Sequence, residues 1–144
     1  TGGTELTVSH DAYASKFDVN LERNLELSDN GEALIGNDQI TLLTNRDRSK
    51  EISIHDLEYE VRFQFHPAVT VQILDNDMAK INSKEAGAWI LGALNLIPSI
   101  QPSYYFSEGR SSPIPTQQVI FSTKFNDFLQ QVRWSFVKSY DIDA

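Results

Sequence analysis

Cysteine is absent from the 144-residue sequence, and basic residues are scarce. Without cysteine the chain can form neither a disulfide framework nor a thiolate site. This does not decide the compartment, because a domain of this size folds without disulfides. Lys and Arg number 12 against 20 Asp and Glu, which gives a net charge of −8. That negative charge opposes non-specific attraction to nucleic acid, anionic lipid or a sulfated polysaccharide, so we expect no nucleic-acid partner.

Long hydrophobic runs are missing as well. The longest mainly apolar run, Ala86 to Ile100, is too short to span a bilayer and is interrupted by Gly92, Asn95 and Pro98. We therefore expect no membrane insertion. The sequence opens with Thr1-Gly2-Gly3 and has neither an initiator Met nor a basic-then-apolar leader. We expect it to be one piece of a longer protein.

What the sequence does contain is alternation with a period of two, which is typical of strands that bury one face. From Val19 to Leu27 apolar and polar residues alternate, and a run of turn formers, Ser28 to Gly31, leads into a second alternating stretch that ends at Leu43. These segments predict a hairpin. Arg23 occupies an inward slot of the first strand, so we expect it to lie near an edge or to be paired.

The clearest strand signal is the segment around Val61. Tyr59, Val61, Phe63 and Phe65 point one way while charged and polar residues point the other, and we expect this strand at the centre of the core. Pro67 ends or bends it, because proline cannot donate a ladder hydrogen bond.

Further strands are predicted along the rest of the chain. They cover Val69–Ile73, Met78–Asn82, Ala88–Leu91, Tyr104–Phe106, Gln117–Ser122 and Val132–Val137. Segment 86–96 could form a helix, but Trp89 and Ile90 suit a strand and no N-cap stands out, so we predict a strand. Polar residues 44–51 predict a surface loop. The sequence thus indicates an all-β protein, an antiparallel β-sandwich of about ten strands in one domain over residues 1–144.

Five short segments and a closing tripeptide, taken in order, resemble the C-terminal β-domain of heparinase II/III-like proteins of bacteria. That family has a His-Asp-Gly-Tyr segment that opens a strand, then Phe-His-Leu-His-Pro, Gly-x-x-Trp and Thr-Gln-Gln-Ile strands, and a closing Val-Arg-Trp. The corresponding segments here are Ser9–Tyr13, Arg62–Val69, Gly87–Trp89, Ser103–Gly109, Pro115–Phe121 and Val132–Trp134. Two departures from the pattern matter most: Ala12 stands where the family often has Gly, and Gln64 stands where one of the paired histidines is expected.

The resemblance implies a polysaccharide lyase whose complete chain has an α/α toroid followed by an antiparallel β-sandwich, a supersandwich. Such enzymes cleave beside a uronic acid by β-elimination: a Tyr or His takes the proton from the sugar C5, and another group offsets the carboxylate charge. The resemblance also implies that the catalytic groups and a structural divalent metal lie mostly upstream of Thr1. We therefore expect no catalytic residue, metal or cofactor in this piece.

The implied partners are an acidic polysaccharide, met through the parent chain, and the parent's own N-terminal toroid. The resemblance favours the periplasm or cell envelope as the location. It implies a structural or cleft-forming role for the present residues.

Six residues are candidates for contacting substrate: His10, Tyr13, His66, Tyr104, Tyr105 and Arg110. A His beside a phenol suits acid–base work, but on a strand His10 and Tyr13 would face opposite sides unless the chain turns between them. Tyr104 and Tyr105 could stack on sugars while Arg110 binds a carboxylate, although large aromatics on strands more often fill cores. The same reasoning predicts that both tryptophans are buried.

Other candidate sites are weak. The three histidines, His10, His55 and His66, have no second ligand at metal-binding spacing, so each is more often a turn cap or a partner of the backbone. The basic residues Arg46, Arg48 and Lys50 more often form a solvated loop than a polymer site. A non-catalytic carbohydrate-binding or envelope-scaffold sandwich remains the main alternative function, and a capsid or adhesin jelly roll is a third.

Overall fold

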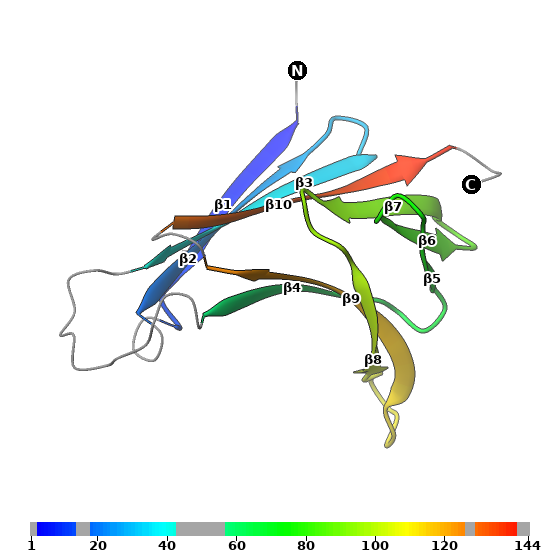
Figure 1. Ribbon diagram of the computed structural model, residues 1–144. Coiled ribbons are helices and arrows are strands. Elements are labelled where there is room, and N and C mark those ends of the chain that lie inside the picture. The colour runs from blue at the N-terminus through cyan, green and yellow to red at the C-terminus, as the bar shows by residue number, and fades with distance from the viewer. Residues whose placement is uncertain (1–2, 14–17, 43–56, 126–128, 141–144) are drawn as a thin grey trace. The chain divides into compact units, whose positions relative to one another are not determined.

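The computed structural model describes residues 3–13, 18–42, 57–125 and 129–140, and their regular structure is entirely β. The strands are β1 Thr4–His10, β2 Val19–Leu27, β3 Ala33–Leu42, β4 Glu58–Gln64, β5 Thr70–Ile73, β6 Ala79–Ser83, β7 Gly87–Ala93, β8 Ser99–Tyr105, β9 Ile114–Lys124 and β10 Leu129–Ser139. Hydrogen bonds join them into two antiparallel sheets, ordered β1-β2-β3-β10-β7-β6-β5 and β4-β9-β8 (Figure 1). The expected all-β fold of about ten antiparallel strands is confirmed. Among the residues described, no helix is long and apolar enough to cross a membrane.

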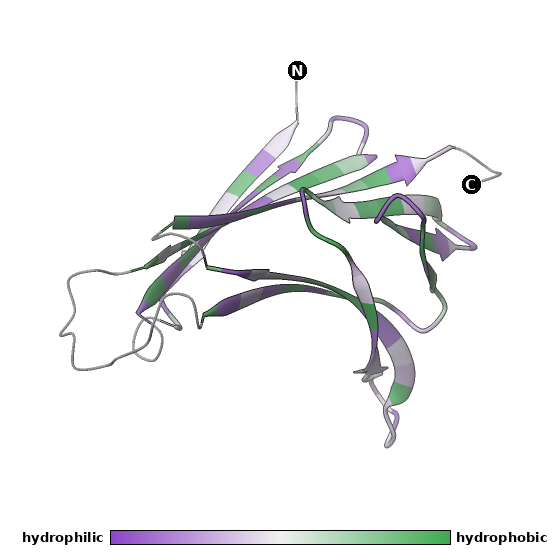
Figure 2. Cartoon of the chain, viewed as in Figure 1, coloured by the Kyte–Doolittle hydropathy of each residue, from purple (hydrophilic) through white to green (hydrophobic). Residues whose placement is uncertain are grey.

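The chain divides into two compact units. Unit 1 comprises Thr1–Tyr59 and Thr123–Ser135, and unit 2 comprises Glu60–Ser122 and Phe136–Ala144. Each has its own buried residues, so each is described by itself. Green and purple residues alternate along the strands in Figure 2, as expected for strands with one buried face.

The predicted hairpin in unit 1 is confirmed by β2 and β3. Their register runs without a break from Val19 opposite Leu42 to Leu27 opposite Leu34. In the connecting turn the N–H of Gly31 donates to the carbonyl of Ser28 at 2.9 Å. Gly31 has φ +71°, a left-handed conformation that glycine adopts without a steric cost.

The apolar core of unit 1 is built from both sheets. Val19 on β2 and Ile40 on β3 pack with Leu57, which precedes β4, and with Phe125, which follows β9. All four side chains are buried. Residues from the two sheets therefore share one interior within this unit.

A charged network lies on the same inner face of unit 1. The Arg23 guanidinium donates two hydrogen bonds to Asp38, from Nε to Oδ1 and from Nη2 to Oδ2, each at 2.7 Å. The Tyr59 hydroxyl donates a third to Oδ2 of Asp38 at 2.9 Å, and Asp38 is 0% exposed. The expectation that Arg23 would be paired or lie at an edge is confirmed by its pairing. Burial, followed by the Asp38 carboxylate, raises the pKa of Tyr59 above its usual value.

Trp134 lies beside Arg23 of this network, and its predicted burial is confirmed at 5% exposure. The Arg23 guanidinium lies 5.9 Å from the centre of its ring. Gly36 on β3 lets the indole approach the backbone closely, because a Cβ there would lie 2.0 Å from Cε2 of Trp134. A side chain at position 36 and the indole at position 134 thus cannot both occupy this space.

Strand β1 is an edge of the seven-stranded sheet and was not singled out by the alternation pattern. Every residue from Thr4 to His10 is exposed, including Leu6 at 54% and Val8 at 46%. The Ser9–Tyr13 segment therefore ends a strand and turns, whereas the family pattern has it opening one.

In unit 2 the alternation predicted around Val61 is confirmed, since Val61 is buried and Glu60, Arg62 and Gln64 are exposed. Its expected place at the centre of the core is wrong, because β4 is an edge strand and β9 is central in the order β4-β9-β8. A strand with one face exposed to solvent shows the clearest alternation of apolar and polar residues. The central strand shows instead a continuous apolar run, Val119–Phe121, at most 1% exposed.

The remaining strands of unit 2 follow the predicted hairpins. Asp77 takes φ +60° in the turn between β5 and β6, and segment 86–96 contains strand β7, so the choice of strand over helix is confirmed. Trp89 is half-buried and stacks on Phe136, with ring centres 5.0 Å apart. The predicted loop 44–51, with its three basic residues, and His55 lie outside the described residues.

Candidate functional site

The first pair of predicted site residues lies in unit 1, where β1 ends. The chain turns after His10, and the turn brings the rings of His10 and Tyr13 to 5.4 Å between centres. Both residues are exposed, Tyr13 by 46%. The backbone N–H of Ala12 donates to Nδ1 of His10 at 3.3 Å. The turn that this pair required is therefore present.

The second pair lies in unit 2. His66 follows β4, Tyr105 ends β8, and their rings meet edge to face with centres 4.7 Å apart. The backbone N–H of Ala68 donates to Nδ1 of His66 at 3.1 Å. Tyr105 is half-buried while His66 is exposed. A site residue predicted on each of two separate strands thus contributes to one small cluster.

Both imidazoles use Nδ1 in the same way. A nitrogen that accepts a backbone N–H carries no proton, so the neutral ring has its proton on Nε2. Nε2 is then a hydrogen-bond donor and Nδ1 is already engaged. With Nδ1 engaged in this way, Nε2 of His10 and of His66 is the atom left to contact a ligand.

Tyr104 and Arg110 occupy different positions from this pair. Residues opposite one another in an antiparallel ladder share a face, and Tyr104 pairs with Pro115 while Tyr105 pairs with Ile114. The two tyrosines therefore face opposite sides of β8. Arg110 is exposed in the β8–β9 loop, where its N–H donates to the carbonyl of Ser107 at 3.2 Å.

The expectation that the aromatic run at 104–106 fills the core holds only in part. Tyr105 is half-buried, but Tyr104 is 56% exposed and Phe106 is 77% exposed. Local alternation assigns side chains to faces and does not reveal where along a strand the core ends. The prediction of core packing was wrong for these two rings.

A polar row on the outer face of the three-stranded sheet was not given a role from the sequence. Arg62 on β4 donates to Gln118 on β9 across 3.4 Å and forms an ion pair with Glu60. Gln64 donates to the carbonyl of Tyr104, and Gln118 donates to that of Pro102 at 3.2 Å. The polar residues at the outward positions of β4 were visible in the sequence. Their hydrogen-bond partners on the other strands depend on strand order, which the sequence does not show.

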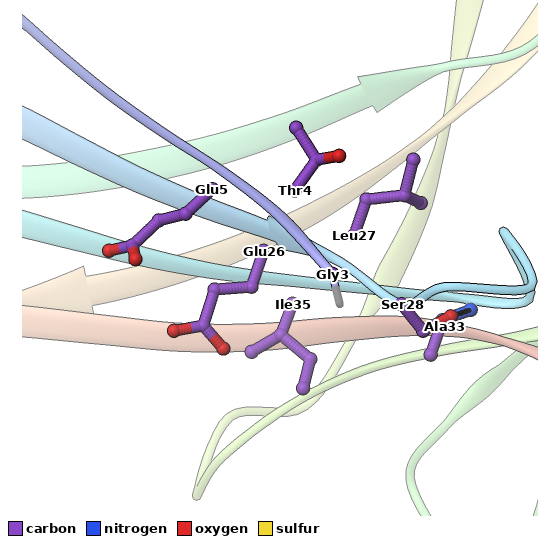
Figure 3. Close-up of a pocket in the computed structure, with 8 residues that line it drawn as sticks. All are labelled: Gly3, Thr4, Glu5, Glu26, Leu27, Ser28, Ala33 and Ile35. Atoms are coloured by element: carbon purple, nitrogen blue, oxygen red, sulfur yellow. Dashed lines mark hydrogen bonds between the residues drawn. The ribbon is translucent and has the colours of Figure 1, made fainter. Parts of the chain in front are cut away.

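A pocket of about 290 Å³ lies in unit 1 beside β1, β2 and β3 (Figure 3). Its lining residues are Gly3, Thr4, Glu5, Glu26, Leu27, Ser28, Ala33 and Ile35. Glu5 and Glu26 are opposite one another in the ladder, so two carboxylates share one face. They would repel an anionic ligand, and none of the predicted site residues lines this pocket.

The described residues hold no group of three or more His, Asp or Glu side chains that could bind a metal ion.

The sequence matches the family described as "Heparinase II/III-like, C-terminal" over residues 1–135. The chain belongs to this family. The match covers both ring pairs and the whole three-stranded sheet, so the resemblance drawn from the short ordered segments is confirmed. The comparison with curated proteins gave no match.

Proposed function

We propose that this heparinase II/III-like chain is the β-sandwich part of a polysaccharide lyase that cleaves beside a uronic acid by β-elimination. In that reaction a base removes the C5 proton, the electrons form a C4–C5 double bond, and the C4 oxygen leaves with a proton from an acid. A positive or hydrogen-bonding group offsets the charge on the uronate carboxylate. The observation that carries this proposal is the family match over residues 1–135.

Within this function the present chain forms part of the wall of the substrate cleft. His10 and His66 offer Nε2–H groups for hydroxyl or carboxylate oxygens, and Arg110 offers an exposed guanidinium. In both imidazoles Nδ1 accepts a backbone N–H, so Nε2 is the atom available to a ligand. Within this proposal the base and the acid of the elimination come from other parts of the lyase.

Unsaturated uronate products absorb ultraviolet light, which gives a direct assay. The protein encoded by the complete reading frame and the 144-residue chain would each be incubated with alginate, hyaluronan and heparin. We expect absorbance to rise with the complete protein and to stay flat with the chain alone. No rise with the complete protein on any of the three would contradict the lyase. Equal turnover by the chain alone would place the base within it.

The exposed rings of Tyr104 and Phe106 favour a second candidate function, a carbohydrate-binding sandwich without catalysis. A family fold does not by itself establish an activity, since one fold hosts many functions. Binding of these polysaccharides by the complete protein, with no unsaturated product, would select this candidate.

A further inference from the structure

One side of the β8–β9 hairpin changes from buried to exposed along its length. Val119 pairs with Ile100 and is 0% exposed, whereas Tyr104, four residues further along β8 than Ile100 and on the same side, is 56% exposed. The side chains that continue this side past the buried part are Pro102, Tyr104, Pro115 and Gln117, all exposed. We call these four residues the hairpin stripe. Figure 1 shows the yellow end of this hairpin extending past β4.

The backbone beneath the stripe is held in place by two glutamines. Gln118 donates to the carbonyl of Pro102, and Gln64 donates to the carbonyl of Tyr104. Both residues carry stripe side chains, so the backbone from which the pyrrolidine and the phenol ring project is held before any ligand arrives. Binding to a preformed surface loses less conformational entropy than binding to a mobile one.

Pro102 also indicates which class of ligand can bind the hairpin stripe. Strand β8 is an edge of its sheet, and an edge strand can pair with a strand from another chain. Proline has no N–H to donate, so Pro102 in the middle of β8 hinders such pairing. A ligand of the stripe must therefore contact the side chains rather than extend the sheet, which disfavours a peptide strand.

The chemistry of the stripe suits sugar rings. It has one aromatic face, two pyrrolidine rings and one amide, and none of the four residues is charged. The apolar C–H faces of pyranose rings can stack on Tyr104, and Gln117 can bond their hydroxyls. In a chain of net charge −8, an uncharged surface avoids the repulsion that an acidic one would exert on a polyanion.

We infer that the hairpin stripe binds the sugar chain of a uronate-containing polysaccharide, with Tyr104 as the stacking platform. The substrate class rests on the proposed function. The stripe itself rests on the exposure, pairing and chemistry of its four residues. Phe106, the first residue after β8 and 77% exposed, extends the aromatic surface toward the loop that carries Arg110.

The test is a calorimetric titration of the 144-residue chain with alginate and hyaluronan oligosaccharides, which measures their binding affinity. We expect Tyr104→Ala to weaken binding by at least about fivefold, the order expected on losing one stacking ring, and Tyr104→Phe to retain it. Tyr140→Ala is the matched control, because Tyr140 is also exposed, by 68%, but lies at the end of β10. Unchanged melting temperatures would show that each variant folds.

Three results would overturn the inference: no binding by the unmodified chain, equal binding by Tyr104→Ala, or equal weakening by Tyr140→Ala. Gln117→Ala provides a second variant on β9, and it should also weaken binding. The two proposals fail separately. Cleavage by the complete protein, with no effect of Tyr104→Ala on binding, would contradict the role of the stripe and support the lyase activity. Binding that depends on Tyr104, with no cleavage by the complete protein, would support the stripe and contradict the lyase activity.

Discussion

The two units stabilise their interiors by different means. In unit 1 the inner face carries Arg23, Asp38 and Tyr59 in one hydrogen-bonded network, with Asp38 fully buried. In unit 2 the described side chains that are exposed by 1% or less are apolar, including Leu91 at 0% and Phe121 at 1%, and the buried charged residue is Lys80, at 6%. A buried charge is tolerated only when it is paired and hydrogen-bonded. The stability of unit 1 therefore depends on the hydrogen-bond geometry around Asp38, whereas that of unit 2 depends more on how well its apolar side chains fill the interior.

The largest effect is expected in unit 2, from loss of volume. Phe121 is 1% exposed and meets Phe63 edge to face, with ring centres 6.1 Å apart. Phe121→Ala should lower the free energy of unfolding by about 3–5 kcal/mol in a urea titration. Phe106→Ala is the control in the same unit, and its 77% exposure predicts almost no change. Equal losses from both would contradict the assignment of the core.

The second largest loss of stability is expected in unit 1, from removal of the buried charge of Asp38. Asp38→Ala leaves the Arg23 charge and the Tyr59 hydroxyl without their acceptor, and should cost about 3 kcal/mol. This is the low end of the range for buried pairs, because the Arg23 side chain keeps 36% of its exposure. The double variant Arg23→Met with Asp38→Leu should recover most of the loss in the same urea titration. Failure to recover would mean that Asp38 acts through more than its charge.

A smaller effect compares two glycines that face side chains. Gly36→Ala would push a Cβ to 2.0 Å from the Trp134 ring, whereas Gly92→Ala would meet Cγ of Met78 at 3.3 Å. Trp134 is 5% exposed and cannot move, but Met78 is 39% exposed and can. We expect a loss of about 1–3 kcal/mol for Gly36→Ala and a clearly smaller one for Gly92→Ala by thermal unfolding. The reverse order would contradict the packing described for unit 1.

The smallest effect depends on pH. The raised pKa of Tyr59 means that its protonated form is favoured by folding. The stability that it contributes is full below the pKa of about 10 in the unfolded chain and is lost as pH rises through the folded value. Tyr59→Phe should cost about 1 kcal/mol at neutral pH and make stability above about pH 10 less dependent on pH. Parallel curves for both proteins in alkaline urea titrations would refute this.

The strands and their faces were predictable from the sequence because alternation is local. It placed Arg23 inward and required it to be paired or to lie at an edge, but it could not name Asp38 as its partner. That contact needs the register of β2 against β3, in which the two residues are opposite. Gly36 and Trp134 were hidden for the same reason, since their contact joins residues on separate strands.

The candidate site was predictable to a smaller extent. The ring pair His10–Tyr13 was anticipated as a sequence-local cluster, and the turn that it needed is present. The pairing of His66 with Tyr105 depends on strand order and could not be read from spacing. The exposure of Tyr104 depends on where the buried part of the hairpin ends, which no periodicity reports.

The four edges of the two sheets differ in how open they are to a further strand. Strand β5 has only four residues, β8 is interrupted by Pro102, and β4 projects the ion pair of Glu60 and Arg62. Strand β1 has seven exposed residues with no proline, no lysine and no bulge against β2. Of the four edges, β1 is therefore the one with the fewest features that oppose pairing with a further strand.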